Sequence, residues 1–211
     1  MASAFFYGTL IHPDILRRVI GNDGSHLQVC PAILFDYTRH KVSWADYPGI
    51  VPYKNSRSMF SRELTEEERS VRGTMVTGLT ERDIRLLDVF EGDEYNRVLT
   101  QVYTLTPLTA LASAGSTNGL ATLVPANPPP LPARDQLGEP VHAQTYVWRP
   151  EMLGDLVGEL WSFDAFVRDN AWKWLGKGSR DNADYALVDA TREPNGGGYD
   201  VPAKEINGRS R

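Results

Sequence analysis

The order of the apolar segments is the feature that most limits how this chain can fold. Segments with strand composition occur at 3–10, 27–34, 37–42, 71–79, 95–105 and 141–148. Strands 27–34 and 37–42 follow each other without a helix between them, so strands and helices do not alternate regularly. This order argues against a doubly wound parallel sheet. We expect an α+β fold with a small mixed sheet or barrel and flanking helices.

Three segments carry helical signals. Pro13 stands at a first helical position and Gly21 ends the apolar period that follows. Thr80 followed three residues later by Asp83 resembles a capping box, and an apolar arc extends from there to Phe90. A third helix is expected between Ser162 as N-cap and Gly176 as the stop.

Two short segments are read from local chemistry. Prolines 48 and 52 bracket a stretch that forms either a loop or a short edge strand. Thr65 and the acidic residues that follow it predict a capped helical turn.

Proline is unevenly distributed along the 211 residues. Seven of the 14 prolines lie between 107 and 140. We therefore expect one domain over 1–175 with a Pro-rich insertion at about 106–140, and a polar C-terminal extension over 176–211. Neither added segment has the composition to bury a second core. The insertion is either a flexible loop or a lid that narrows substrate choice.

Composition limits the partners. The formal net charge of −5 argues against a nucleic-acid-binding protein. No apolar run approaches the roughly 20 residues of a membrane helix, so no membrane partner is expected. The N-terminus has no basic region and reaches Gly8 too early for a signal peptide. We expect a cytoplasmic protein that acts on a small molecule, and no oligomeric state follows from the sequence.

Common cofactor and nucleophile motifs are missing from the sequence. The four histidines show no i, i+3 or i, i+4 pair, which argues against a metal site. There is no phosphate-binding loop, no dinucleotide fingerprint and no G-x-S-x-G elbow. The single cysteine, Cys30, lies in a strand and is interpreted as an inert core thiol. No metal and no cofactor are therefore expected.

The stretch Tyr7-Gly8-Thr9-Leu10 is the first candidate for a binding site. It ends the first strand, and a glycine there allows backbone N–H groups to approach an anionic or carbonyl ligand. The alternative is a tight strand-to-helix turn packed by the Tyr7 ring.

Glu91 is the second candidate. On the helical wheel it falls between Leu87 and Ile84, inside the apolar arc of its helix. Burial of a carboxylate costs free energy, so the pKa of Glu91 is expected to rise into the range useful for a general acid or base. The alternative is that the helix frays before Gly92 and Glu91 points to water.

These stretches together resemble a known family. Residues 7–10, the pair Tyr47-Pro48 and the run 87–97 (LDVFEGDEYNR) are similar in order and spacing to the gamma-glutamylcyclotransferase-like superfamily, in its AIG2-like or gamma-glutamylamine cyclotransferase branch. The resemblance covers roughly 3–105 and, more loosely, 141–175. It implies a small mixed β-barrel with flanking helices.

The resemblance also implies a reaction. Enzymes of this kind release 5-oxoproline from a γ-glutamyl amine or peptide without metal or cofactor. Glu91 would be the general acid/base, and Tyr95 would line the pocket or orient Glu91, with Tyr47 a weaker candidate of the same kind. The residues implied to bind substrate are Tyr7, Gly8, Thr9, Leu10, Tyr47 and Tyr95.

Alternatives stay open beside this reading. The pocket can serve another acid/base cyclisation or isomerisation, or the protein can be a non-catalytic AIG2-like binding protein. In the last case Phe166, Trp172 and Trp174 would form a partner surface rather than core. Arg97 either pairs with a nearby aspartate or binds a substrate carboxylate.

Overall fold

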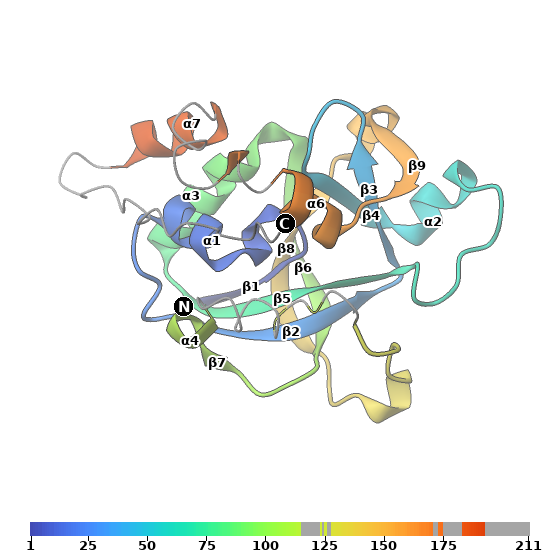
Figure 1. Ribbon diagram of the computed structural model, residues 1–211, viewed down its shortest axis with the longest axis horizontal. Coiled ribbons are helices and arrows are strands. Elements are labelled where there is room, and N and C mark those ends of the chain that lie inside the picture. Colours follow the sequence, from blue (N-terminus) through green and yellow to red (C-terminus); the bar gives the residue numbers. More distant parts are fainter. Residues whose placement is uncertain (115–122, 124, 126–127, 171–172, 175–182, 193–211) are drawn as a thin grey trace, which may run out of the picture.

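A closed mixed β-barrel forms the centre of the computed structural model, which describes residues 1–114, 123, 125, 128–170, 173–174 and 183–192 (Figure 1). The barrel order is β5-β1-β8-β6-β2, and pairing of β2 with β5 closes it. Its strands are β1 (Ala2–Phe6), β2 (Gln28–Phe35), β5 (Ser70–Leu79), β6 (Tyr95–Thr104) and β8 (Val141–Trp148). Flanking helices complete an α+β fold, which confirms the predicted fold class.

One parallel pairing makes the barrel mixed. β1 runs parallel to β8, with Ala4 opposite Gln144, whereas its other neighbour, β5, is antiparallel. The pairs β2–β5, β2–β6 and β6–β8 are also antiparallel. The end of β1 therefore emerges between β5 and β8, and this places residues 7–10 at the rim of the barrel.

A second, three-stranded sheet lies beside the barrel. β3 (Tyr37–Val42) is its centre, with β4 (Pro48–Pro52) and β9 (Leu156–Leu160) antiparallel on either side. β4 is a short edge strand, which is one of the two alternatives left open for the stretch between the prolines. The sequence analysis missed β9, because Gly158 and Glu159 interrupt the apolar alternation of this edge strand.

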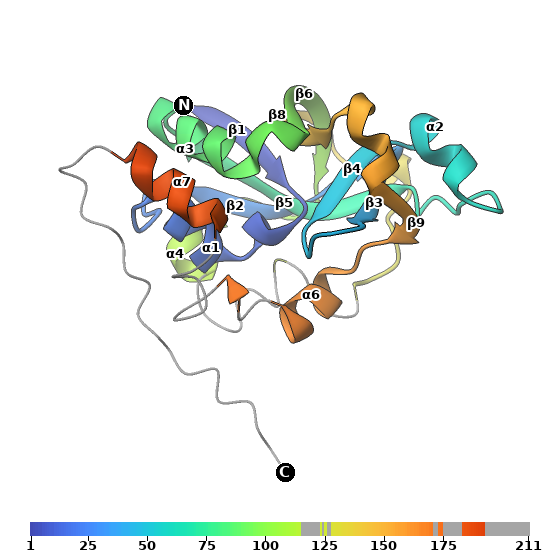
Figure 2. The same ribbon diagram turned by 90° about the horizontal axis from the view of Figure 1, so that it is seen from above.

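The three longest of the described helices lie at the end of the molecule away from the small sheet. Figure 2 shows α1 (Pro13–Ile20), α3 (Glu81–Glu91) and α7 (Ala183–Thr191) together there. The short helices are α2 (Tyr53–Ser56), α4 (Leu111–Ala114), α6 (Phe163–Asp169) and the 3-10 turns η1 (Thr9–Ile11), η2 (Arg57–Met59), η3 (Gly92–Glu94), η4 (Arg134–Gln136) and η5 (Pro150–Asp155). None of the helices in the described ranges combines the length and apolar character that a membrane crossing requires.

The local helix signals are confirmed. Pro13 is at the start of α1, and Gly21 caps its end with φ +69°, the left-handed conformation that glycine adopts at low cost. Thr80 and Asp83 form the capping box of α3. Thr65 and Glu68 exchange side-chain and backbone hydrogen bonds in a turn that precedes β5.

The C-terminal segments differ from expectation. α6 begins after Ser162 as predicted but ends at Asp169, because Asp169 and Asn170 are weak helix formers. Gly176, the predicted stop, lies outside the described residues. α7 was not predicted; Tyr185 and Val188, three residues apart, bury one face of it.

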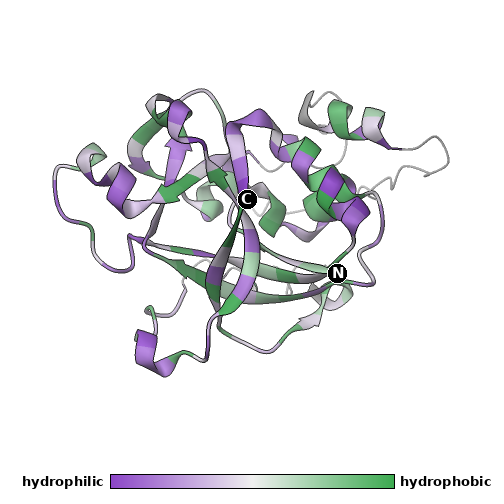
Figure 3. Ribbon diagram, turned by 180° about the vertical axis from the view of Figure 1, so that it is seen from behind, coloured by the Kyte–Doolittle hydropathy of each residue, from purple (hydrophilic) through white to green (hydrophobic). Residues whose placement is uncertain are grey.

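Three apolar clusters hold the fold together, and the smallest (Val42, Val51, Trp148 and Leu156) joins the small sheet to β8. Another fills the barrel interior and includes Phe5, Tyr7 and Cys30; the third joins the barrel to α1, α3 and α7. Figure 3 shows hydrophobic and hydrophilic residues alternating along the barrel strands, as a sheet packed on one face requires. Burial raises the pKa of the Cys30 thiol, which supports its interpretation as an inert core residue.

The described parts of the Pro-rich segment are attached to the barrel. β7 (Thr109–Ala110) adds to the edge of β2, and Leu111 is buried in the largest apolar cluster. The Arg134 guanidinium lies 3.1 Å from the Asp36 carboxylate and 2.9 Å from that of Glu66.

Asp83 supplies the first testable prediction. Its buried carboxylate accepts hydrogen bonds from the Thr80 amide at 2.9 Å and the Asn22 side chain at 3.3 Å, and lies 3.0 Å from His26 Nε2. Burial acts to raise the pKa of Asp83, but the bonds from Thr80 and His26 outweigh it and lower the pKa below the usual value. Its charge therefore stabilises the fold above the ordinary Asp pKa, and this contribution is lost as pH falls through the lowered value.

We expect Asp83→Asn to reduce the free energy of unfolding by about 1–3 kcal/mol at neutral pH. The difference from wild type should shrink in acid, where Asp83 itself is protonated. Urea unfolding of both proteins, at neutral pH and in acid, measures this difference in stability. Glu81→Gln, in the exposed first turn of the same helix, is the control and should change stability by less than about 0.5 kcal/mol. An equal loss at both pH values would contradict the role of the Asp83 charge.

Candidate functional site

A cavity of about 600 Å³ lies where the end of β1 meets the end of α3. Tyr47, Pro48, Tyr146, Trp174 and part of α7 complete its walls. The structure brings to this one cavity the residues predicted as catalytic or substrate-binding, namely Tyr7, Gly8, Thr9, Leu10, Tyr47, Glu91 and Tyr95. None of the described residues of the Pro-rich segment lines it.

Position 8 requires glycine because the Pro48 ring approaches it closely, and not because its backbone is left-handed. Its φ is −119°, which other residues also adopt. A Cβ atom at this position would lie only 3.0 Å from Cδ and Cγ of Pro48. The absent side chain therefore lets β4 pack directly against the turn that begins η1. Within η1, the first N–H groups have no intrahelical acceptor.

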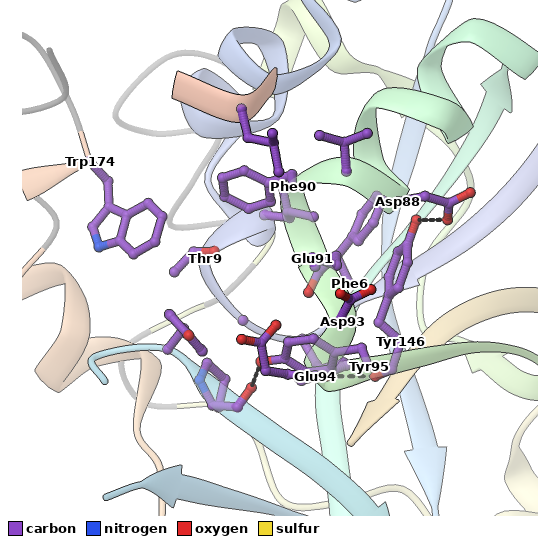
Figure 4. Close-up of a pocket in the computed structure, with 18 of the residues that line it drawn as sticks. Phe6, Thr9, Asp88, Phe90, Glu91, Asp93, Glu94, Tyr95, Tyr146 and Trp174 are labelled. Carbon is purple, nitrogen blue, oxygen red and sulfur yellow. Dashed lines mark hydrogen bonds between the residues drawn. The ribbon is translucent and has the colours of Figure 1, made fainter. Parts of the chain in front are cut away.

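Glu91 is the last residue of α3 and lines the cavity (Figure 4). The helix does not fray before it. Gly92 ends α3 with φ +70° while its N–H still donates to the Asp88 carbonyl. Glu91 is half-buried, so the apolar arc of the sequence predicted the inward direction of this carboxylate.

Three tyrosines of the cavity are fixed by hydrogen bonds. Tyr7 Oη donates to the Tyr146 carbonyl at 2.5 Å, and Tyr95 Oη donates to the Pro48 carbonyl at 2.8 Å. Tyr146 Oη donates to Asp88 Oδ1 at 2.9 Å. Each phenol proton thus has an acceptor within the protein.

The charge of Glu91 affects the pKa values of the same three tyrosines. Burial and then the Glu91 carboxylate raise the pKa of Tyr7 well above its usual value. The pKa of Tyr146 rises for the same two reasons in the same order. For Tyr95, burial, Tyr7 and Glu91 raise the pKa in that order. All three phenols are therefore protonated at neutral pH, and each lies close enough to Glu91 for its charge to act on the phenol.

Arg97 takes the first of its two predicted roles. Its Nε and Nη2 lie 2.7 Å and 3.2 Å from the two oxygens of Asp88, and it also bonds the Gln144 side chain. Asp88 therefore accepts from both Arg97 and Tyr146. This arrangement fixes the last turn of α3 against β6 and β8.

Sequence reasoning missed Arg39. Arg39 is half-buried, and its guanidinium donates to the carbonyls of Tyr7 at 2.8 Å and Arg72 at 3.2 Å. Burial lowers its pKa to about 10, which leaves it charged at neutral pH. Arg39 thus holds the backbone of the residue before Gly8, and no signal in the alternating segment 37–42 points to this role.

The aromatic residues of the C-terminal region belong to the interior. Phe166 and Trp174 are buried, which favours core packing over an exposed partner surface for these two side chains. Trp172 lies outside the described residues. Tyr146, Trp174 and two residues of α7 were not predicted as cavity residues, because only the folded chain brings them to α3.

Several known proteins are similar to this chain in sequence or in structure. Residues 4–114 match the family model described as gamma-glutamyl cyclotransferase, AIG2-like. AIG2-like protein D of Arabidopsis thaliana is 27% identical over 175 residues, which cover 83% of this chain and 81% of that protein. AIG2-like protein A of the same plant is 22% identical over 198 residues, or 94% and 88% of the two chains. A crystal structure of gamma-glutamyl cyclotransferase specific to glutathione from yeast superposes with a TM-score of 0.39, 16% identity and coverage of 70% and 68%.

The Gly8–Pro48 contact supplies the second prediction. Gly8→Ala places a methyl group 3.0 Å from the Pro48 ring, so β4 or the turn must shift. We expect the free energy of unfolding to fall by about 1–3 kcal/mol, as for other overpacked sites. Thermal or urea unfolding measures the loss.

Gly154→Ala is the matched control. Nothing lies within 4 Å of the Cβ atom that this change adds, so stability should change by less than about 0.5 kcal/mol. A Gly8→Ala protein as stable as Gly154→Ala would show that the contact with Pro48 is not tight.

Proposed function

Because the chain belongs to the AIG2-like gamma-glutamyl cyclotransferase family, we propose that it releases 5-oxoproline from a γ-glutamyl amine or peptide with Glu91 as general acid/base. One observation carries this proposal. The Glu91 carboxylate lines the same cavity as the Gly8 turn and the rings of Tyr7, Tyr95 and Tyr146. A carboxylate in such a partly desolvated place is suited to proton transfer.

The proposed reaction is a transfer within the substrate. Glu91 accepts a proton from the uncharged α-amino group of the γ-glutamyl unit. The freed nitrogen then attacks the γ-carbonyl carbon, so that a ring C–N bond forms and the C–N bond to the leaving amine breaks. Glu91 returns the proton to the leaving amine. Both reacting groups belong to one molecule, so binding in the folded-back conformation supplies much of the orientation.

The turn and the phenols have different proposed roles. The protons of Tyr7, Tyr95 and Tyr146 already bond to acceptors of the protein. We therefore assign to these phenols the positioning of the turn, of β4 and of the last turn of α3. Donors to the substrate or to the developing oxyanion are the backbone N–H groups of Gly8, Thr9 and Leu10.

Glu91→Gln tests the proposal, since it keeps the shape of the side chain and removes the base. We expect the wild-type protein to release 5-oxoproline from members of a panel of γ-glutamyl amines and dipeptides. In Glu91→Gln the rate should fall about 10²–10⁴-fold, with no matching change in thermal stability. Chromatographic assay of 5-oxoproline measures both proteins.

Glu81→Gln, at the opposite end of α3 and outside the cavity, should keep wild-type activity. Undiminished release by Glu91→Gln would overturn the role of Glu91. A wild-type protein that converts no member of the panel would overturn the reaction itself.

A further inference from the structure

Aromatic side chains form one wall of the cavity, on the side of Trp174. The indole of Trp174 meets Tyr47 edge-on at a centroid distance of 6.3 Å and Phe90 edge-on at 5.9 Å. All three side chains line the cavity. In the view of Figure 4, Trp174 and Tyr146 lie on opposite sides of Glu91. The wall therefore extends the cavity away from the Asp88–Tyr146 side.

α7 extends this wall and is itself firmly attached. Tyr185 Oη donates to the Trp174 carbonyl at 3.0 Å, and the two oxygens of Asp189 accept from Arg18 of α1 at 2.6 and 2.5 Å. This attachment carries Leu187 to the cavity, where its side chain is 59% exposed. Leu187 thus offers apolar surface to the cavity without being needed for core packing.

The charged side chains in the described lining of the cavity are all acidic. The described lining contains the carboxylates of Asp88, Glu91, Asp93 and Glu94 and no lysine, arginine or histidine. Arg97 pairs with the carboxylate of Asp88. A further carboxylate on the leaving part of a substrate would meet repulsion here, since like charges in a partly desolvated site destabilise each other.

We propose that the wall formed by the rings of Tyr47, Phe90 and Trp174, together with Leu187, binds the leaving amine. The preferred substrates then carry a large aromatic amine without a carboxylate. This inference rests on the proposed function, because it takes Glu91 and the Gly8 turn to hold the γ-glutamyl end. The cavity volume of about 600 Å³ is in the usual range for ligands larger than one amino acid. Flat rings pack edge-on or offset against such a wall.

Three compounds test it, namely the γ-glutamyl derivatives of tryptamine and of ethylamine, and γ-glutamyl-tryptophan. The first two differ in the aromatic group, and the first and third differ in one carboxylate. We expect kcat/KM for 5-oxoproline release to be at least about 10-fold higher for the tryptamine derivative than for either of the others. Calorimetric Kd values for the same compounds on Glu91→Gln, which should bind without turnover, measure the subsite separately from the chemistry.

Leu187→Ala is the variant of choice, because removal of an exposed side chain leaves the core intact. It should raise Kd for the tryptamine derivative about 5-fold and leave the ethylamine derivative unchanged. Leu99→Ala on β6, where the leucine is 68% exposed and outside the cavity, is the matched control and should change neither.

The two proposals fail in different ways. Tight, aromatic-dependent binding without release of 5-oxoproline would reject the proposed reaction and keep the subsite. Release with equal Kd values for the tryptamine and ethylamine derivatives would reject the subsite and keep the reaction. Preference for γ-glutamyl-tryptophan over the tryptamine derivative would reject the exclusion of carboxylates.

Discussion

The hydrogen bonds of Tyr7 connect the parts of the molecule on which the site depends. Its phenol donates to the backbone of β8, its carbonyl accepts from Arg39 of the small sheet, and its ring packs in the barrel interior. Hydrogen bonds therefore fix the phenol and the carbonyl of Tyr7, and packing fixes its ring. Because Gly8, Thr9 and Leu10 follow directly, the position of the turn is set by contacts with three separate elements rather than by the turn itself.

Close packing then relates this turn to the rest of the cavity. Gly8 admits the Pro48 ring, and the Pro48 carbonyl in turn accepts the Tyr95 phenol just beyond α3. A chain of direct contacts therefore runs from the end of β1 through β4 to the start of β6. Glu91 sits four residues before Tyr95, so the same contacts limit where its carboxylate can lie. A rigid arrangement of this kind is what proton transfer between fixed groups requires.

The structural features that the sequence predicts well are those that depend on residues close together in the chain. The capping box of Thr80 and Asp83 and the apolar arc that includes Glu91 depend on one helix alone, and both were recognised. Arg39 and α7 were not, because their roles arise from contacts with residues far away in the chain. Arg39 looks like an ordinary strand residue until the Tyr7 carbonyl lies 2.8 Å from it. The place of α7 in the fold depends on the packing of Tyr185 against Trp174 and Phe90.

The proposed chemistry and half of the proposed selectivity wall come from different parts of the chain. Glu91, the Gly8 turn and Tyr95 all fall within residues 4–114, the part that matches the family model. Trp174 and Leu187 lie outside it, on segments attached through Arg18 and Tyr185. A wall built from such segments can change without disturbing the carboxylate or the turn. Members of one family can therefore keep a common proton-transfer site while the C-terminal region determines which leaving amine is accepted.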